Sequence, residues 1–301
     1  MGSFDADLIH GFLIKGALRP ALEYLAQFPE QEADLQRYQS IFEREQFLVY
    51  PVDDFLNQLL QVFQRYYRNV FYLEHPEAEA RQEMQRSFAQ LLPHGADPFG
   101  EGWENPVQAA FEAQGFHYLG GKTSGYYGPY IWKTTKQETY QVELPEGTQP
   151  YRVNLLSDFL SRSWLDYLSL GRVGTGGWAD EDGILNCVAS SYDFASEAFT
   201  VSFLKHEAQH AMDLARNPAL SPVVLEYRAK LVELIYSTAR NLLSQFAKEA
   251  DGSNKANTHS AASEKIVTAF EAKFGRDALS ALPIPQIQET ARALFAASDI
   301  S

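Results

Sequence analysis

The segment Leu204-Lys205-His206-Glu207-Ala208-Gln209-His210 lies within residues 194–216, whose pattern predicts one α-helix. Helical spacing puts His206 and His210 on one face, one turn apart, as two legs of a tetrahedral zinc site. Glu207 projects beside them and can reach a water on the metal without binding the metal itself. The segment therefore predicts a helix that holds one Zn²⁺ per chain, with a carboxylate placed to handle a proton.

A third protein ligand is needed to complete such a site. The metzincin pattern would place Gly at 213 and His or Asp at 216, but the chain has Asp213 and Arg216. Gluzincins instead use a Glu on the next helix, and Ser221-Pro222 indicates where that helix starts. A short connection makes the two helices antiparallel. Glu226, roughly 7–8 Å past the turn, is then level with His210, roughly 10 Å before it.

Two more carboxylates lie on the predicted metal-facing stripes. Glu233 follows Glu226 on the same helical face and should reach the level of His206, either as the alternative ligand or beside a ligand. Asp213 could accept the second ring N–H of a metal-bound His, as carboxylates usually do, or be a carboxylate on the helix surface. A hydrogen-bond donor for the oxyanion is also expected. The possible donors are Tyr192, Tyr227, Tyr126 and His117.

The pattern His206-Glu207-x-x-His210-x-x-Asp213, followed by Glu226-Tyr227-Arg228-Ala229, resembles the gluzincin metallopeptidases that include anthrax lethal factor and the Mlc titration factor peptidases. Members of that group carry H-E-F-x-H-x-x-D and then a Glu-Phe-Phe-Ala helix. The resemblance covers residues 195–236. Ala208 stands where the group has Phe, and the gap between His210 and Glu226 is short.

The resemblance implies a zincin-like region and hydrolysis of peptide bonds by a metal-activated water, with Glu207 as the general base. It also implies that a peptide substrate binds by strand addition along an edge strand preceding the active helix. The short strand predicted at residues 184–189 is the natural candidate. The Gly-rich segment 171–178, with Trp178, would be a wall of the cleft or a plain connection.

The remaining patterns predict an α+β fold that is mainly helical. Two domains are expected: an N-terminal helical region, residues 1–115, and a catalytic region, residues 116–301. Within them the expected elements are a bundle of three or four helices (5–95), a small antiparallel sheet (116–155), a helix (157–168), a Gly-rich loop (171–183), a second active-site helix (from 221 to about 248), a mobile loop (250–262) and two closing helices (264–274, 286–297).

Composition narrows the possible partners. The net charge is −14 and no Lys/Arg run occurs, which argues against nucleic acid and anionic lipid and favours neutral or cationic partners. The peptide or protein substrate is what the resemblance implies. No stretch of 18 apolar residues occurs, so no membrane span is expected. The absence of a signal-peptide pattern favours the cytoplasm. Met1-Gly2-Ser3 could be an expression remnant, so secretion after removal of a leader stays open.

Three hypotheses compete on the sequence alone. The first is a zinc peptidase. The second is a binding or regulatory protein on a zincin scaffold, with weak or no turnover. The third is a helical protein with a chance motif. The intact Glu207 favours the first, because loss of this base is the usual sign of an inactive relative.

Overall fold

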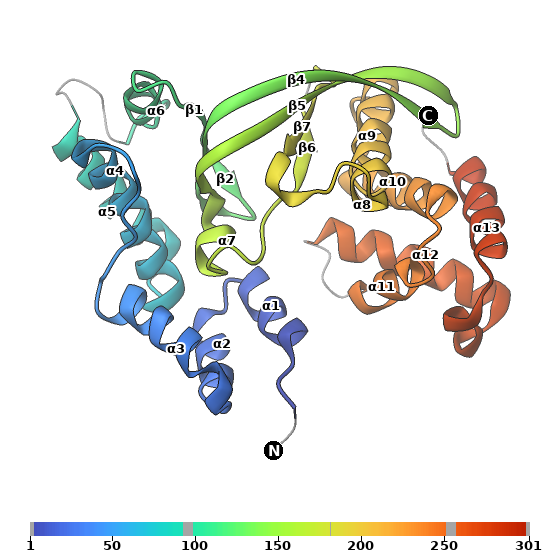
Figure 1. The fold of residues 1–301 in the computed structure, drawn as a ribbon, viewed down its shortest axis with the longest axis horizontal. Helices are drawn as coiled ribbons and strands as arrows, with labels where there is room; N and C mark the ends of the chain where they lie inside the picture. The colour runs from blue at the N-terminus through green and yellow to red at the C-terminus, as the bar shows by residue number, and fades with distance from the viewer. Residues whose placement is uncertain (1–2, 93–98, 181, 251–256, 299–301) are drawn as a thin grey trace. The chain divides into compact units, whose positions relative to one another are not determined.

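The computed structural model describes residues 3–92, 99–180, 182–250 and 257–298, and it shows an α+β protein that is mainly helical (Figure 1). The chain forms two compact units, and each is built from two separate segments. Unit 1 comprises Met1–Thr134 and Ser157–Thr175, and unit 2 comprises Thr135–Leu156 and Gly176–Ser301. The division therefore differs from a single boundary at residue 115, because residues 116–134 belong with the helical region.

Unit 1 has five α-helices before residue 92, rather than three or four, around an aromatic-rich core. Stacked rings such as Phe71 and Trp164, with centroids 4.9 Å apart, fill its centre. Its helices and short strands are α1 (Ala6–Ile14), α2 (Leu18–Leu25), α3 (Glu32–Tyr38), α4 (Asp54–Tyr67), α5 (Glu77–Leu91), α6 (Asn105–Glu112), α7 (Ser163–Leu168), β1 (His117–Leu119), β2 (Lys122–Thr123) and β3 (Tyr126–Tyr127), with short helical segments η1 (Pro29–Gln31), η2 (Gln39–Glu43) and η3 (Arg68–Tyr72).

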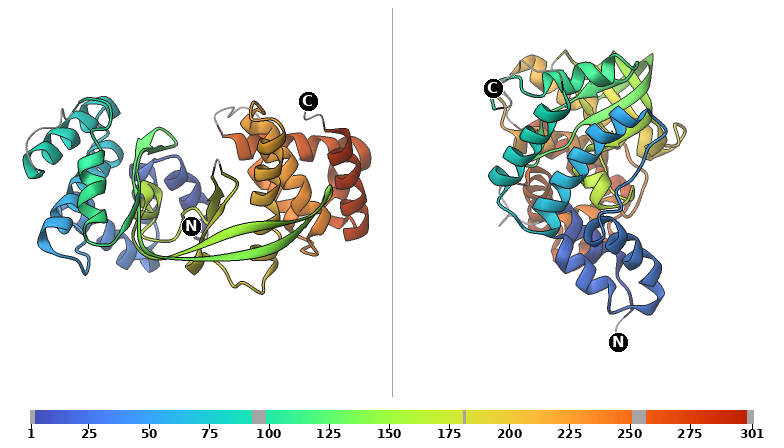
Figure 2. Two further views of the ribbon diagram at one scale, coloured as in Figure 1. Left: turned by 90° about the horizontal axis from the view of Figure 1, so that it is seen from above. Right: turned by 90° about the vertical axis from the view of Figure 1, so that its left-hand side faces the viewer.

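A long β-hairpin provides the central strands of the sheet (Figure 2). Strand β4 (Tyr130–Leu144) turns through Pro145-Glu146 into β5 (Gly147–Arg162), and the two strands are neighbours in the sheet. The helix predicted over residues 157–168 is wrong for its first half, because β5 continues to Arg162. The apolar residues of 157–162 fit the period of a strand as well as that of a helix, and hydrogen bonding to β4 makes this segment a strand.

The sheet is mixed rather than purely antiparallel, with the strand order β1-β4-β5-β7-β6. Strand β7 (Leu185–Val188) is the predicted strand, and it pairs parallel with β5 and antiparallel with β6 (Gly177–Ala179). The Gly-rich loop prediction is wrong at β6. A Cβ at Gly177 would lie 2.3 Å from both the Asn186 carbonyl oxygen and the Phe203 ring, so only glycine lets this strand approach so closely.

Both long helices predicted in unit 2 are interrupted. Residues 194–216 form α8 (Glu197–Thr200) and α9 (Leu204–Arg216), and the break leaves both Val201 and Phe203 buried. The next helix ends early, giving α10 (Pro222–Tyr236) and α11 (Leu242–Glu249). At that end the Glu197 carboxylate accepts hydrogen bonds from Ser237 Oγ and Thr238 N–H, which compete with continuation of the helix.

Two closing helices complete unit 2, as expected, and both begin earlier than predicted. Helix α12 (Thr258–Phe274) is capped by Asn257, whose side chain accepts from the Ser260 N–H, and α13 (Ile284–Ala297) follows η5 (Arg276–Ala281). The predicted mobile loop is therefore helical from Thr258, while residues 251–256 lie outside the described part. In the four described ranges, none of the helices combines the length and apolarity needed to cross a bilayer.

Candidate metal and catalytic site

Helices α9 and α10 pack against each other and carry the site. Asn217 Oδ1 accepts a hydrogen bond from Ala219 N–H in the tight connection between them, and Ser221 and Pro222 hold the predicted N-cap and first helical positions. The antiparallel hairpin expected from this short connection brings one face of α10 opposite the histidine face of α9. Helix α10 also packs on α12 and α13, so it is fixed from several sides.

Three predicted ligands converge between these helices. The Nε2 atoms of His206 and His210 lie 3.0 Å apart. Glu226 places Oε2 3.5 Å from Nε2 of His206 and Oε1 3.6 Å from Nε2 of His210. One ligand atom from each of the three residues lies within 4.8 Å of the others. Two imidazole nitrogens and a carboxylate oxygen at this spacing can surround a single divalent ion.

An unsatisfied buried atom indicates that the residues fit such an ion. Among the described residues, no group donates a well-directed hydrogen bond to Glu226 Oε2. Nδ1 of His259 lies 2.9 Å from this oxygen but makes no well-directed hydrogen bond to it, and a cation at the centre of the three ligand side chains would satisfy this buried oxygen. The N₂O donor set matches catalytic zinc, which keeps a fourth position open.

The electrostatics of the centre also favour positive charge. Burial disfavours the charged form of His206, but hydrogen bonding to Glu226 and Glu233, with the charges of Glu233 and Glu207, raises its pKa to about 10. Burial likewise opposes ionisation of Glu226, yet His206, His210 and His259 hold the pKa of its carboxyl far below the usual range. The carboxylates therefore stabilise a cation between the helices, whether a proton or a metal ion.

Glu233 and Asp213, the two further carboxylates predicted near the site, have different surroundings in the structure. Glu233 Oε1 lies 2.8 Å from Nδ1 of His206, on the far side of the ring from Glu226, so Glu233 orients this ring. The expected pairing of Asp213 with a histidine ring is not seen, and Asp213 is not on the surface either. It is fully buried, and it accepts hydrogen bonds from Gln209 Nε2 and Arg228 Nε at 2.9 and 2.7 Å.

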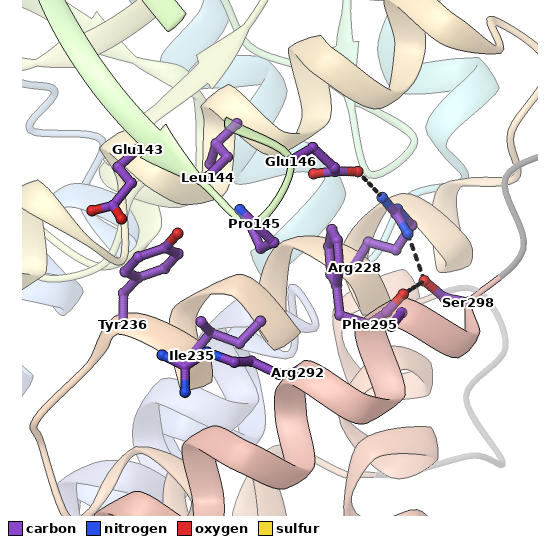
Figure 3. Close-up of a pocket in the computed structure, with 11 residues that line it drawn as sticks. Glu143, Leu144, Pro145, Glu146, Arg228, Ile235, Tyr236, Arg292, Phe295 and Ser298 are labelled. Carbon is purple, nitrogen blue, oxygen red and sulfur yellow. Dashed lines mark hydrogen bonds and ion pairs between the residues drawn. The ribbon is translucent and has the colours of Figure 1, made fainter. Parts of the chain in front are cut away.

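Arg228 joins several elements behind the site. Its buried guanidinium donates to Asp213 on α9. It also donates to Glu146 in the hairpin turn and to Ser298 after α13 (Figure 3). Arg228, Glu146 and Ser298 border a cavity of about 620 Å³ between the hairpin turn, α10 and α13, and none of the three convergent ligands lines this cavity. Because Arg228 is only two residues from Glu226, the same contacts fix the helix that carries the predicted third ligand.

Replacing Arg228 with Leu should lower the free energy of unfolding by about 3–5 kcal/mol, because it leaves the buried charge of Asp213 without its partner. Arg216→Leu is the matched control. Arg216 pairs with the same Glu146 but its side chain is 42% exposed, so its loss should cost only about 0–1 kcal/mol. Urea denaturation measures both, and equal effects would contradict a dominant role for the buried pair.

Glu207 lies beside the convergent ligands and contacts the edge of the sheet. Its Oε2 accepts a hydrogen bond of 3.1 Å from the Ala179 N–H of β6. Glu207 is therefore held without being in the group of three convergent ligands. The strand next to it is β6, and the predicted edge strand at residues 184–189 is instead an interior strand between β5 and β6.

The expected oxyanion donors occupy different surroundings. Tyr192 packs on Phe203 in unit 2, and burial, with Cys187, Glu207 and Glu233 nearby, raises its pKa. Tyr227 packs against the apolar core of unit 2, and burial raises its pKa. The other two belong to unit 1: His117 stacks on Trp132 with ring centroids 5.3 Å apart, and Tyr126 packs on Phe71 and Trp164.

His259 is a site residue that the sequence interpretation missed. Its Nδ1 lies 2.9 Å from Glu226 Oε2, and its ring is nearly parallel to that of His206 at a centroid distance of 6.5 Å. It comes from the second residue of α12, inside the segment interpreted as a mobile loop. Asn257 as a helix N-cap was the available signal for an ordered position there, but no spacing relates α12 to α9.

Comparisons of this chain with models of known protein families, with curated proteins and with solved structures found no match.

Proposed function

We propose that this protein is a zinc-dependent peptidase in which Glu207 is the general base. The observation that carries the proposal is the convergence of His206, His210 and Glu226 within 4.8 Å, with Glu207 on the same helix. The arrangement combines three ligand atoms, a fourth direction left for water or substrate, and a carboxylate outside the ligand set. Such a combination serves hydrolysis rather than a purely structural metal site, which usually has four protein ligands.

The proposed chemistry assigns a distinct task to each side chain. His206, His210 and Glu226 would hold the ion, which when bound polarises a carbonyl and acidifies water. Glu207 takes a proton from the attacking water as the new C–O bond forms, and delivers it to the amine nitrogen as the C–N bond breaks. Glu233 keeps Nδ1 of His206 occupied and so directs Nε2 toward the centre.

Peptides are the substrate class that the sheet favours. Strand β6 ends the sheet, and Ala179 in this strand touches Glu207 through its N–H. An extended peptide that adds to the outer edge of β6 by backbone hydrogen bonds would pass beside this carboxylate. The open position of the ion and the general base would then face one peptide bond of the added strand.

Metal analysis and removal test the proposal. The purified chain should contain about one zinc per molecule, and a strong chelator should remove both the zinc and the cleavage of a mixed peptide library read by mass spectrometry. Adding back zinc should restore cleavage. A chain that binds no transition metal after exposure to zinc would refute the proposal. A chain that binds zinc but cleaves no peptide would be a binding protein on a catalytic scaffold.

A further inference from the structure

We propose that His259 is a catalytic residue that donates a hydrogen bond to the oxygen of the reacting carbonyl. This inference rests on the proposed peptidase function and adds to it a residue from outside the two motif helices. The geometric basis is its contact with Glu226, at 2.9 Å between Nδ1 and Oε2, combined with its exposure.

Exposure distinguishes His259 from the ligands it stands beside. Its side chain is 53% exposed, whereas the side chains of His206, His210 and Glu226 are 9%, 12% and 13% exposed. A substrate has to reach the open position of the ion from the side where solvent reaches the ligands. Since the exposed imidazole is in contact with the ligand Glu226, we infer that the carbonyl oxygen enters on the side of His259.

His259 is unsuited to be a fourth ligand in this arrangement. The group of mutually close ligand atoms comprises His206, His210 and Glu226, and within the described part of the chain His259 does not join it. Its ring instead lies parallel to that of His206, beyond the Glu226 carboxylate. A ring at this position can form hydrogen bonds with a group at the centre while the fourth coordination position stays open.

Hydrogen bonds fix the N-terminal turn of α12, which carries His259. Asn257 caps the helix through the Ser260 N–H. The hydroxyl groups of Ser260 and Ser263 donate to the backbone oxygen and the carboxylate of Glu249, respectively, and Lys230 on α10 pairs with the same carboxylate at 2.7 Å. This support from α10 and α11 means that the donor is positioned before the substrate arrives, as an effective oxyanion donor must be.

In the proposed step, His259 stabilises the negative charge that develops on the carbonyl oxygen. As water attacks, the carbonyl π electrons move onto the oxygen, which becomes negative, and Glu207 holds the water proton. His259 hydrogen-bonds that oxygen more strongly than the ground-state carbonyl and transfers no proton. The negative oxygen reforms the carbonyl as the C–N bond breaks and the proton goes to nitrogen. Removing one such donor typically lowers kcat by about 10²–10³-fold.

The test compares the full-length zinc-loaded wild type with His259→Ala, His259→Gln and the control Lys265→Ala, an exposed position on the same helix. The substrate is the best-cleaved peptide from a library digested by the wild type. We expect His259→Ala to lower kcat by about 10²–10³-fold with KM nearly unchanged, His259→Gln to recover part of the loss through its amide N–H, and Lys265→Ala to match the wild type.

Three readouts do not depend on turnover. Zinc affinity measured against a chromogenic chelator, and the visible spectrum of the Co²⁺-substituted protein, should be nearly unchanged in His259→Ala. Affinity for a phosphinic analogue of the same peptide should fall in parallel with kcat. Equal kcat in wild type and His259→Ala, or a large loss of zinc affinity with an altered Co²⁺ spectrum, would overturn the role of His259 alone. A wild type that binds zinc and cleaves nothing would overturn the peptidase proposal, and this inference with it.

Discussion

Glu207→Gln is expected to lower peptide hydrolysis by about 10²–10⁴-fold, the usual worth of general acid–base catalysis. Zinc content and folding should not change, because Glu207 is outside the convergent ligand group and contacts the described part of the sheet through the hydrogen bond from Ala179 N–H. Glutamine keeps the size of the side chain and an oxygen that can accept this bond. It cannot take a proton from water, and that is the function the substitution removes.

The measurement is the initial rate of peptide cleavage at matched zinc occupancy, with the unfolding midpoint of both proteins recorded in parallel. Glu264→Gln on α12 provides a control for a Glu-to-Gln change elsewhere in unit 2, and it should retain the wild-type rate. If Glu207→Gln cleaves as fast as the wild type, the activity comes from a contaminant or from another mechanism.

Glu226→Ala should abolish tight zinc binding, whereas Glu233→Ala should weaken it by only about 10–100-fold. The two residues are on the same helix and both touch His206, but at different ring nitrogens. Glu226 Oε2 lies 3.5 Å from Nε2, the atom that faces His210, while Glu233 Oε1 lies 2.8 Å from Nδ1. Loss of the first removes a ligand, and loss of the second only frees the ring to reorient.

Zinc dissociation constants determined by chelator competition distinguish the two effects. His210→Ala serves as the reference for loss of a ligand, and Glu226→Ala should resemble it. The reverse order, with Glu233→Ala the more damaging, would transfer the ligand role to Glu233 and require α10 to rotate from the observed position. Both variants should be compared without metal as well, because an unpaired buried charge can lower stability by itself.

The parts of the site carried by local helical spacing could be predicted from the sequence. The relation between His206, Glu207 and His210 is set by one helix, and the position of Glu226 follows from a short connection to the next helix. The mainly helical α+β character also follows from apolar periodicity. Here the chain neighbours of each residue already determine its geometry, so no knowledge of distant contacts is needed.

Features that depend on distant contacts could not be predicted. Strand β6 consists of Gly177-Trp178-Ala179, which has no strand pattern, and only pairing with β7 defines it. The end of α10 depends on the Glu197 carboxylate. Asp213 is oriented by Arg228 on the neighbouring helix and not by a histidine on α9. His259 reaches the site only because α12 packs on α10. In each case tertiary packing outweighs local preference.

The interleaved path of the chain limits how the protein can be divided. Unit 2 takes Thr135–Leu156 from the middle of the sequence and the rest from residue 176 onward, with a segment of unit 1 between them. Val142, Leu144 and Val153 from that first piece are buried in the core of unit 2. A fragment starting at residue 176 would retain every residue assigned to the metal centre. It would lack Val142, Leu144 and Val153, and the core residues that pack on them would be exposed to solvent. The residues assigned to the site therefore lie in one continuous stretch of the sequence, whereas the unit that surrounds them is built from two stretches.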